Sequence, residues 1–117
     1  MATFQGENIA FKIVLTDDSG DVISTDDVVD IEFDLYLEYN KKVYLTYAIN
    51  NTGEEREIRA ATDKSGFEFE LEATDSADLV PGRYIMQVKY QTTDTRFDGG
   101  TKITMQKGPL VKIMKAV

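Results

Sequence analysis

The feature of this sequence that most limits its fold is an alternation of apolar and polar residues from residue 29 to residue 39. Successive side chains of a β-strand point to opposite faces, so residues two apart share a face. The alternation therefore predicts a long strand with one face in a core and the other in water. The expected core face holds Val29, Ile31, Phe33, Leu35, Leu37 and Tyr39. The expected outer face holds Asp30, Glu32, Asp34, Tyr36 and Glu38.

Shorter stretches of the same kind predict further strands at 8–16, 43–49, 67–73, 83–90, 101–105 and 110–114. The segment 57–62 is either a short strand or one helical turn, with the strand favoured, and 22–23 is a brief edge segment. Turn-forming Asp, Asn, Gly and Pro residues separate these stretches. No convincing helix is found. About seven to eight strands at regular spacing predict an all-β fold, an antiparallel β-sandwich in one domain over residues 1–117.

The composition excludes several chemistries. The chain has no His and no Cys, so a Ser-His-Asp triad, a thiolate nucleophile, an ordinary zinc site and a disulfide are all excluded. We expect no cofactor. No apolar run exceeds three residues, which predicts neither a membrane-spanning helix nor a signal peptide. The net charge of −8 disfavours nucleic acid as a partner.

The charge is distributed unevenly along the chain. Residues 1–80 hold 19 acidic and 6 basic residues, a charge of −13, whereas residues 81–117 hold 2 acidic and 7 basic residues, a charge of +5. One interpretation is that the C-terminal strands pair beside acidic strands, so that opposite charges meet across the sheet. The other is a bipolar surface that binds copies of itself or a partner.

Two sequence motifs indicate more than the fold class. The first is Gly6-Glu7-Asn8 leading into the strand that ends near Asp17, followed by Gly20 and Ile23. The second runs from Asp78 to Val88 as D-L-V-P-G-R-Y-I-M-Q-V. In it Pro81 and Gly82 make a turn, Leu79 plugs the end of the core, and Tyr84 begins the next strand. This arrangement resembles the tyrosine corner of immunoglobulin-like domains, without the Cys and Trp hallmarks of antibody domains.

Together the motifs resemble the immunoglobulin-like virion structural proteins of tailed phages, including the N-terminal domain family of phage baseplate upper proteins. The resemblance covers nearly the whole chain and rests on structural positions: Gly6, Leu15, Asp17, Gly20, Leu79, Gly82 and Tyr84. It implies a non-enzymatic virion protein, made in the bacterial cytoplasm, that binds neighbouring capsid, fibre or tail subunits or copies of itself. A capsid decoration protein is the favoured expectation. A baseplate or tail adaptor and a carbohydrate-binding or adhesion module of a bacterial surface protein are the alternatives.

An acidic loop makes a weak calcium candidate of Asp17, Asp18 and Asp21, with Asp26, Asp27 and Asp30 downstream. Carboxylate oxygens are the ligands that calcium prefers. The loop does not follow the EF-hand pattern, because Val22 stands where the glycine should be and Val28 where the bidentate glutamate should be. Solvated turn residues are the favoured interpretation.

Two further acidic or polar patterns carry little specificity. Glu68, Glu70 and Glu72 alternate with apolar residues and so share one strand face, which superficially resembles the paired carboxylates of a glycosidase. Any E-x-E strand produces this spacing, of about 6.5–7 Å, so no catalytic residue is predicted. The sequence Asn50-Asn51-Thr52 matches a glycosylation sequon and is interpreted as a turn.

Tyrosines and the C-terminal segment are the partner-binding candidates. Tyr36 and Tyr44 lie among charged residues, where cross-strand packing, a subunit interface and glycan binding all remain open. The segment 107–117 is basic and apolar and follows a Gly-Pro break. It either closes the sheet of its own domain or leaves as an arm that adds a strand to a neighbour. Its candidate contact residues are Leu110, Val111, Lys112, Ile113 and Lys115.

Overall fold

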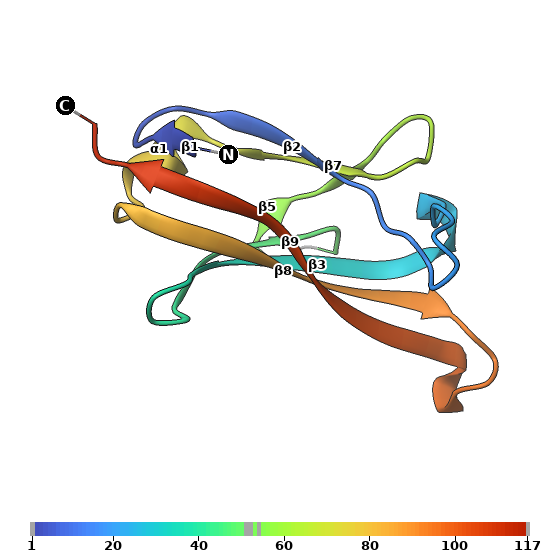
Figure 1. Ribbon diagram of the computed structural model, residues 1–117. Coiled ribbons are helices and arrows are strands. Elements are labelled where there is room, and N and C mark those ends of the chain that lie inside the picture. The colour runs from blue at the N-terminus through green and yellow to red at the C-terminus, as the bar shows by residue number, and fades with distance from the viewer. Residues whose placement is uncertain (1, 51–52, 54, 117) are drawn as a thin grey trace.

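The protein is a β-sandwich of two sheets (Figure 1), seen in a computed structural model that describes residues 2–50, 53 and 55–116. Sheet A has six strands in the order β1-β9-β8-β3-β4-β5, and sheet B has three in the order β2-β7-β6. Sheet A comprises β1 (Ala2–Phe4), β9 (Thr101–Met114), β8 (Gly82–Thr93), β3 (Val28–Leu37), β4 (Val43–Ala48) and β5 (Arg56–Glu57). Sheet B comprises β2 (Ile9–Ile13), β7 (Phe67–Leu71) and β6 (Arg59–Ala60).

The strand order is that of an immunoglobulin-like domain. Three antiparallel strands, β9, β8 and β3, form the middle of sheet A, and β4 and β5 extend it on one side, as the additional strands of a variable-type domain do. β1 runs parallel to the end of β9. The predicted all-β immunoglobulin-like sandwich is confirmed, with nine strands among the described residues rather than seven or eight.

Alternating side chains from both sheets form one core. The four central predicted residues of β3 are at most 8 % exposed, whereas the predicted ends, Val29 and Tyr39, are 53 % and 93 % exposed. Phe69 from β7 lies at the centre, with its ring centroid 5.0 Å from Phe11, 5.1 Å from Phe33 and 4.9 Å from Tyr47. These contacts join both sheets, because Phe11 and Phe69 belong to sheet B and the other two rings to sheet A.

The segment predicted as a short strand or a helical turn is the place where the chain changes sheets. β5 pairs with β4 in sheet A, and β6 pairs with β7 in sheet B. Ile58 lies between these two short strands and is 3 % exposed. A single buried side chain therefore fixes the crossing.

A tyrosine corner closes one end of the core, as the D-L-x-P-G-x-Y motif predicts. The Tyr84 hydroxyl donates a hydrogen bond of 2.7 Å to the carbonyl oxygen of Val80, and Tyr84 is fully buried. Leu79 is 2 % exposed and plugs the core end. The connection before the corner contains a short helix, α1 (Ala73–Ala77), although the sequence pattern shows no convincing helix.

Two further predictions about elements need correction or completion. Residues 101–105 and 110–114 belong to a single strand, β9, because the break at Gly108-Pro109 is a bulge: two residues there lie opposite Met86 alone. The predicted 22–23 edge segment is reduced to one bridge between Thr16 and Val22. Among the described residues, no helix is long and apolar enough to cross a membrane.

Candidate interaction face

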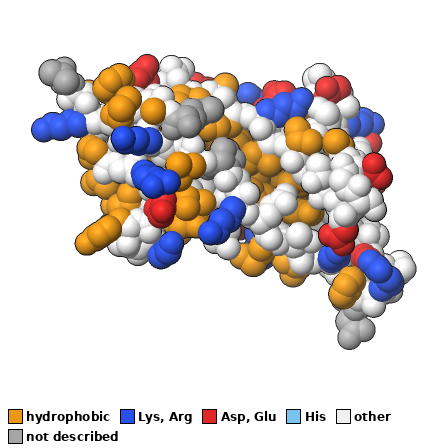
Figure 2. Space-filling model, in the orientation of Figure 1, with side chains coloured by type: hydrophobic (Ala, Val, Ile, Leu, Met, Phe, Trp, Pro, Cys, Tyr) orange, Lys and Arg blue, Asp and Glu red, His pale blue; other side chains and the backbone are white. Residues whose placement is uncertain are grey.

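The outer face of sheet A is the candidate functional site. Strand register places its outward side chains in rows across β3, β8 and β9. From one end to the other, the rows are Glu38–Arg83–Lys112, Tyr36–Ile85–Leu110, Asp34–Gln87–Lys107, Glu32–Lys89–Met105 and Asp30–Gln91–Ile103. Figure 2 shows basic side chains, in blue, gathered with few acidic ones over the end of the molecule where β9 ends.

This face exposes apolar side chains as well as charges. Ile103 and Met105 on β9 are each 57 % exposed, and Val43 on β4 is 47 % exposed. Tyr36, Ile85 and Leu110 are half-buried and form an apolar row across three neighbouring strands. The end of β8 and the beginning of β9 also extend past the rest of the sandwich, at the lower right of Figure 1. The apolar row continues to Val43 on β4, and the polar row Asp34–Gln87–Lys107 separates it from Met105 and Ile103. Exposed apolar residues edged by charges are typical of interaction surfaces.

Only some of the charged residues on this face lie opposite a residue of the other sign on the neighbouring strand. Arg83 Nε lies 3.6 Å from Glu38 Oε2, and Lys89 lies opposite Glu32. The interpretation that basic strands pair beside acidic ones is therefore correct between β8 and β3. Lys112, in contrast, lies opposite Arg83, a like charge. Partial burial raises the pKa of Glu32, with repulsion from Asp34 the next cause.

The two candidate tyrosines have different surroundings. Tyr36 lies on the outer face, with the Lys41 ammonium 5.6 Å from its ring centroid. Tyr44 lies at the register shift between β3 and β4, and its side chain packs against the core. There its ring meets the ring of Tyr84 edge to face, with the centroids 5.7 Å apart. Lys42 covers the Tyr44 ring at 4.9 Å. Tyr36 is thus part of the candidate interaction face, whereas Tyr44 serves cross-strand packing.

The C-terminal segment closes the sheet of its own domain. Lys112 and Ile113 pair with β8 on one side and with β1 on the other, so they have no free edge for a neighbour's strand. Val111 and Ile113 are each 1 % exposed, so their prediction as partner contacts is wrong: they face the core because they share the inner face with Tyr84. Lys112 and Lys115 are exposed, and Leu110 is half-buried on the outer face.

Four residues of this face are not among the partner contacts that the sequence predicts: Ile85, Ile103, Met105 and Lys107. Part of the signal lies in the alternation of β8, where the buried Tyr84 and Met86 leave the apolar Ile85 between them in an outward position. The rows themselves depend on strand register across the bulge at Gly108-Pro109, which the sequence pattern does not define.

The calcium candidates form a turn instead. One carboxylate oxygen of Asp17 accepts hydrogen bonds from the backbone N–H groups of Ser19 (2.9 Å) and Asp21 (3.0 Å). The chain reverses there, with Gly20 at a φ of +85°. No group of three or more acidic side chains in the described part of the chain is placed to hold a metal ion.

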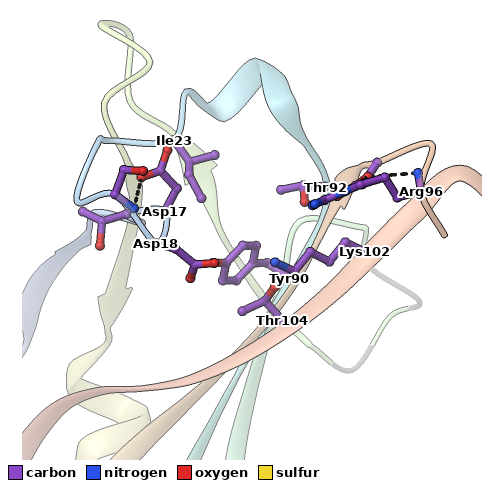
Figure 3. Close-up of a pocket in the computed structure, with 11 residues that line it drawn as sticks. Asp17, Asp18, Ile23, Tyr90, Thr92, Arg96, Lys102 and Thr104 are labelled. Carbon is purple, nitrogen blue, oxygen red and sulfur yellow. Dashed lines mark hydrogen bonds and ion pairs between the residues drawn. The ribbon is translucent and has the colours of Figure 1, made fainter.

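A polar cavity of about 270 Å³ lies beside this turn, between it and the β8–β9 ribbon. Asp17 and Asp18 line one side, and Arg96 and Lys102 line the other (Figure 3). Arg96 is held by Asp94 at 2.7 Å, and this hydrogen bonding lowers the pKa of Asp94 to about 2. Tyr90 forms the floor but is only 4 % exposed, so its ring face is covered.

The glutamates of β7 lie on the outer face of sheet B. Glu68 is opposite Lys12 on β2 and Arg59 on β6, and Glu70 accepts a 3.0 Å hydrogen bond from Asn8. Glu72 lies past the end of the strand, where it precedes α1. Their carboxylates thus face cations and an amide. The sequon Asn50-Asn51-Thr52 lies outside the described residues, apart from Asn50, whose amide donates to Asp30.

No protein-family model matches this chain, and no curated protein matches it either.

Proposed function

We propose that this domain is a non-enzymatic structural protein of a tailed-phage virion that binds neighbouring subunits through the outer face of sheet A. A capsid decoration protein is the first form of the proposal, and a baseplate or tail adaptor is the second. The observation that supports it is the row of half-buried Tyr36, Ile85 and Leu110, together with the exposed Met105 and Ile103 farther along the same face. The phage assignment comes from the resemblance at the motifs around Gly6 and Tyr84.

The remaining features favour a binding function over a catalytic one. In the described residues, Asp17 accepts hydrogen bonds that hold a turn, and Glu68 lies opposite Lys12 and Arg59 in the strand register. The polar cavity beside the Asp17 turn is lined by side chains of both charges, with Arg96 held by Asp94. Apolar outward side chains, by contrast, contribute little to the fold of the monomer and contribute to affinity when a partner covers them.

The proposal is tested by the protein content of purified virions from the genome that encodes the chain. Mass spectrometry should find the protein in a fixed copy number per particle, and capsid, portal or terminase genes should lie beside its gene. A Met105→Lys variant should be depleted from particles, whereas Lys12→Glu on sheet B should be retained. Particles that lack the protein would contradict the proposal.

Glycan binding is the second candidate, supported by one specific observation. A shallow apolar cavity of about 410 Å³ is lined by Tyr39, Pro81 and Arg83 at the turn between β3 and β4. Tyr39 is 93 % exposed, and an exposed ring beside a guanidinium suits a sugar. Saturable binding on a glycan array that Tyr39→Ala abolishes would favour this candidate over the virion proposal.

A further inference from the structure

Two columns of opposite charge flank β8 on the outer face of sheet A. The acidic column on β3 contains Asp30, Glu32 and Asp34, and the basic column on β9 contains Lys107 and Lys112. β8 lies between them, since the strand order is β9-β8-β3. The face therefore has a positive side and a negative side, parallel to the strands.

The two columns neutralise one another only weakly within one chain. Neighbouring strands lie about 4.8 Å apart, so β3 and β9 are about 9.6 Å apart, more than the screening length of about 8 Å at physiological salt. In the row Asp34–Gln87–Lys107, the residue between the charges is neutral. Within the described chain, no ion pair involves Lys107 or Lys112. An acidic surface brought within contact distance would give these lysines partners.

We propose that a second copy of this chain covers the outer face of sheet A, packed face to face about a twofold axis that runs along β8. The inference rests on the proposed use of this face and adds the identity of one partner. Rotation about β8 exchanges the positions of β3 and β9, so β3 of each copy lies over β9 of the partner. Carboxylates then face lysines in two rows, whereas Glu32 and Asp30 lie over the partner's Met105 and Ile103. Asp34 then meets the partner's Lys107, and Glu38 meets the partner's Lys112.

The apolar row supports the same axis. A rotation about β8 keeps each row in register, so Tyr36 lies over the partner's Leu110, and Ile85 meets its own copy on the axis. An axis across the strands would instead place each acidic column over the partner's acidic column, which is unfavourable. Aligned packing of two sheets is a common arrangement, so the backbone does not oppose it.

A single cysteine tests the position of the axis. The chain has no Cys, so Ile85→Cys introduces its only thiol. Sheets that pack face to face lie about 10 Å apart, so the two thiols on the axis are too far apart for a direct disulfide but within reach of a short bis-maleimide crosslinker. This reagent should give a covalent dimer rapidly and at low protein concentration. The control is Ala10→Cys, an exposed position on sheet B, which should stay largely monomeric. Equal crosslinking of the two variants would overturn the proposed axis.

A charge exchange tests the complementarity. Sedimentation should show a wild-type dimer that weakens when salt rises from about 50 mM to about 500 mM. Lys107→Glu and Asp34→Lys should each weaken it about tenfold or more, and the double variant should recover because the new charges again face opposite ones. Lys12→Glu, Glu68→Lys and their double variant make the same charge changes on sheet B and should have no effect. Thermal melting checks that every variant folds.

The failure of this inference is distinct from failure of the proposed function. A wild-type protein that remains monomeric at all concentrations, or a double variant that does not recover, overturns the homodimer. Either result leaves the presence of the protein in virions, which is measured separately, as the test of the proposed function.

Discussion

The outer faces of the two sheets follow the same alternation but differ in what they expose. On sheet B the outward positions hold Lys12, Arg59 and Glu68, which lie opposite one another across three strands. On sheet A the outward positions include Ile85, Met105 and other apolar residues beside charges that are incompletely paired. On sheet B the outward charges thus lie beside charges of the opposite sign. The period-two pattern marks where the core lies, and apolar residues in outward positions mark the surface that we propose binds a partner.

The largest expected effect comes from the core that both faces share. Phe69→Ala removes the ring that packs on Phe11, Phe33 and Tyr47, and we expect it to lower the free energy of unfolding by about 3–5 kcal/mol. The measurement is urea denaturation. Glu68→Ala, one residue away on the opposite side of β7, should change it by no more than about 0.5 kcal/mol. Similar losses in the two variants would show that the inner and outer sides of sheet B are not distinct.

Alkaline pH should lower the stability of the fold through two buried tyrosines on the sheet A side of that core. Burial raises the pKa of Tyr84 to about 12 and also raises the pKa of Tyr47. An unfolded tyrosine loses its proton near pH 10, so above that pH the unfolded chain binds fewer protons than the native one, and stability falls as pH rises. We expect a loss of about 2–3 kcal/mol between pH 9 and pH 11.

Urea denaturation across this pH range measures the loss. The Tyr47→Phe, Tyr84→Phe double variant is the control, because it removes both groups and should flatten the dependence. A double variant as pH-sensitive as the wild type would assign the loss to other groups.

At neutral pH the same two hydroxyls should behave differently. The Tyr84 hydroxyl donates to the Val80 carbonyl, whereas the buried Tyr47 hydroxyl has no hydrogen-bond partner among the described residues. We therefore expect Tyr84→Phe to destabilise the fold by about 1–2 kcal/mol and Tyr47→Phe to be neutral or slightly stabilising. Thermal and urea unfolding of the two variants provide the comparison. Equal losses would contradict the tyrosine corner as the stabilising contact.

Sequence patterns predicted the inner faces well because burial selects apolar residues at every second position. Ile31, Phe33, Phe67 and Leu71 were assigned correctly on that ground. The same rule failed where a strand ends. Tyr39 continues the alternation of β3, but it lies beyond Leu37, where the chain turns into the hairpin. The alternation shows which residues of a strand share a face, but it contains no information on where strand pairing ends.

The candidate site was harder to predict because it depends on register. Gly108-Pro109 has the composition of a break, yet β8 tolerates it as a bulge, and the strand continues. That continuation moves Val111 and Ile113 into the core and leaves Lys112 outside. A basic, apolar segment alone is equally compatible with an arm and with a last strand, so only the pairing with β1 and β8 separates them.

The smallest expected effect on stability falls on the outer face of sheet A itself. Met105 is 57 % exposed, so Met105→Thr should change the free energy of unfolding by no more than about 0.5 kcal/mol, as should Ala10→Thr on sheet B. Only the first should weaken self-association in sedimentation. A loss of stability above about 1 kcal/mol would place Met105 in the packing of the monomer. An apolar residue whose loss weakens association but leaves stability unchanged is one that the fold does not need, and it distinguishes the binding face from the solvated one.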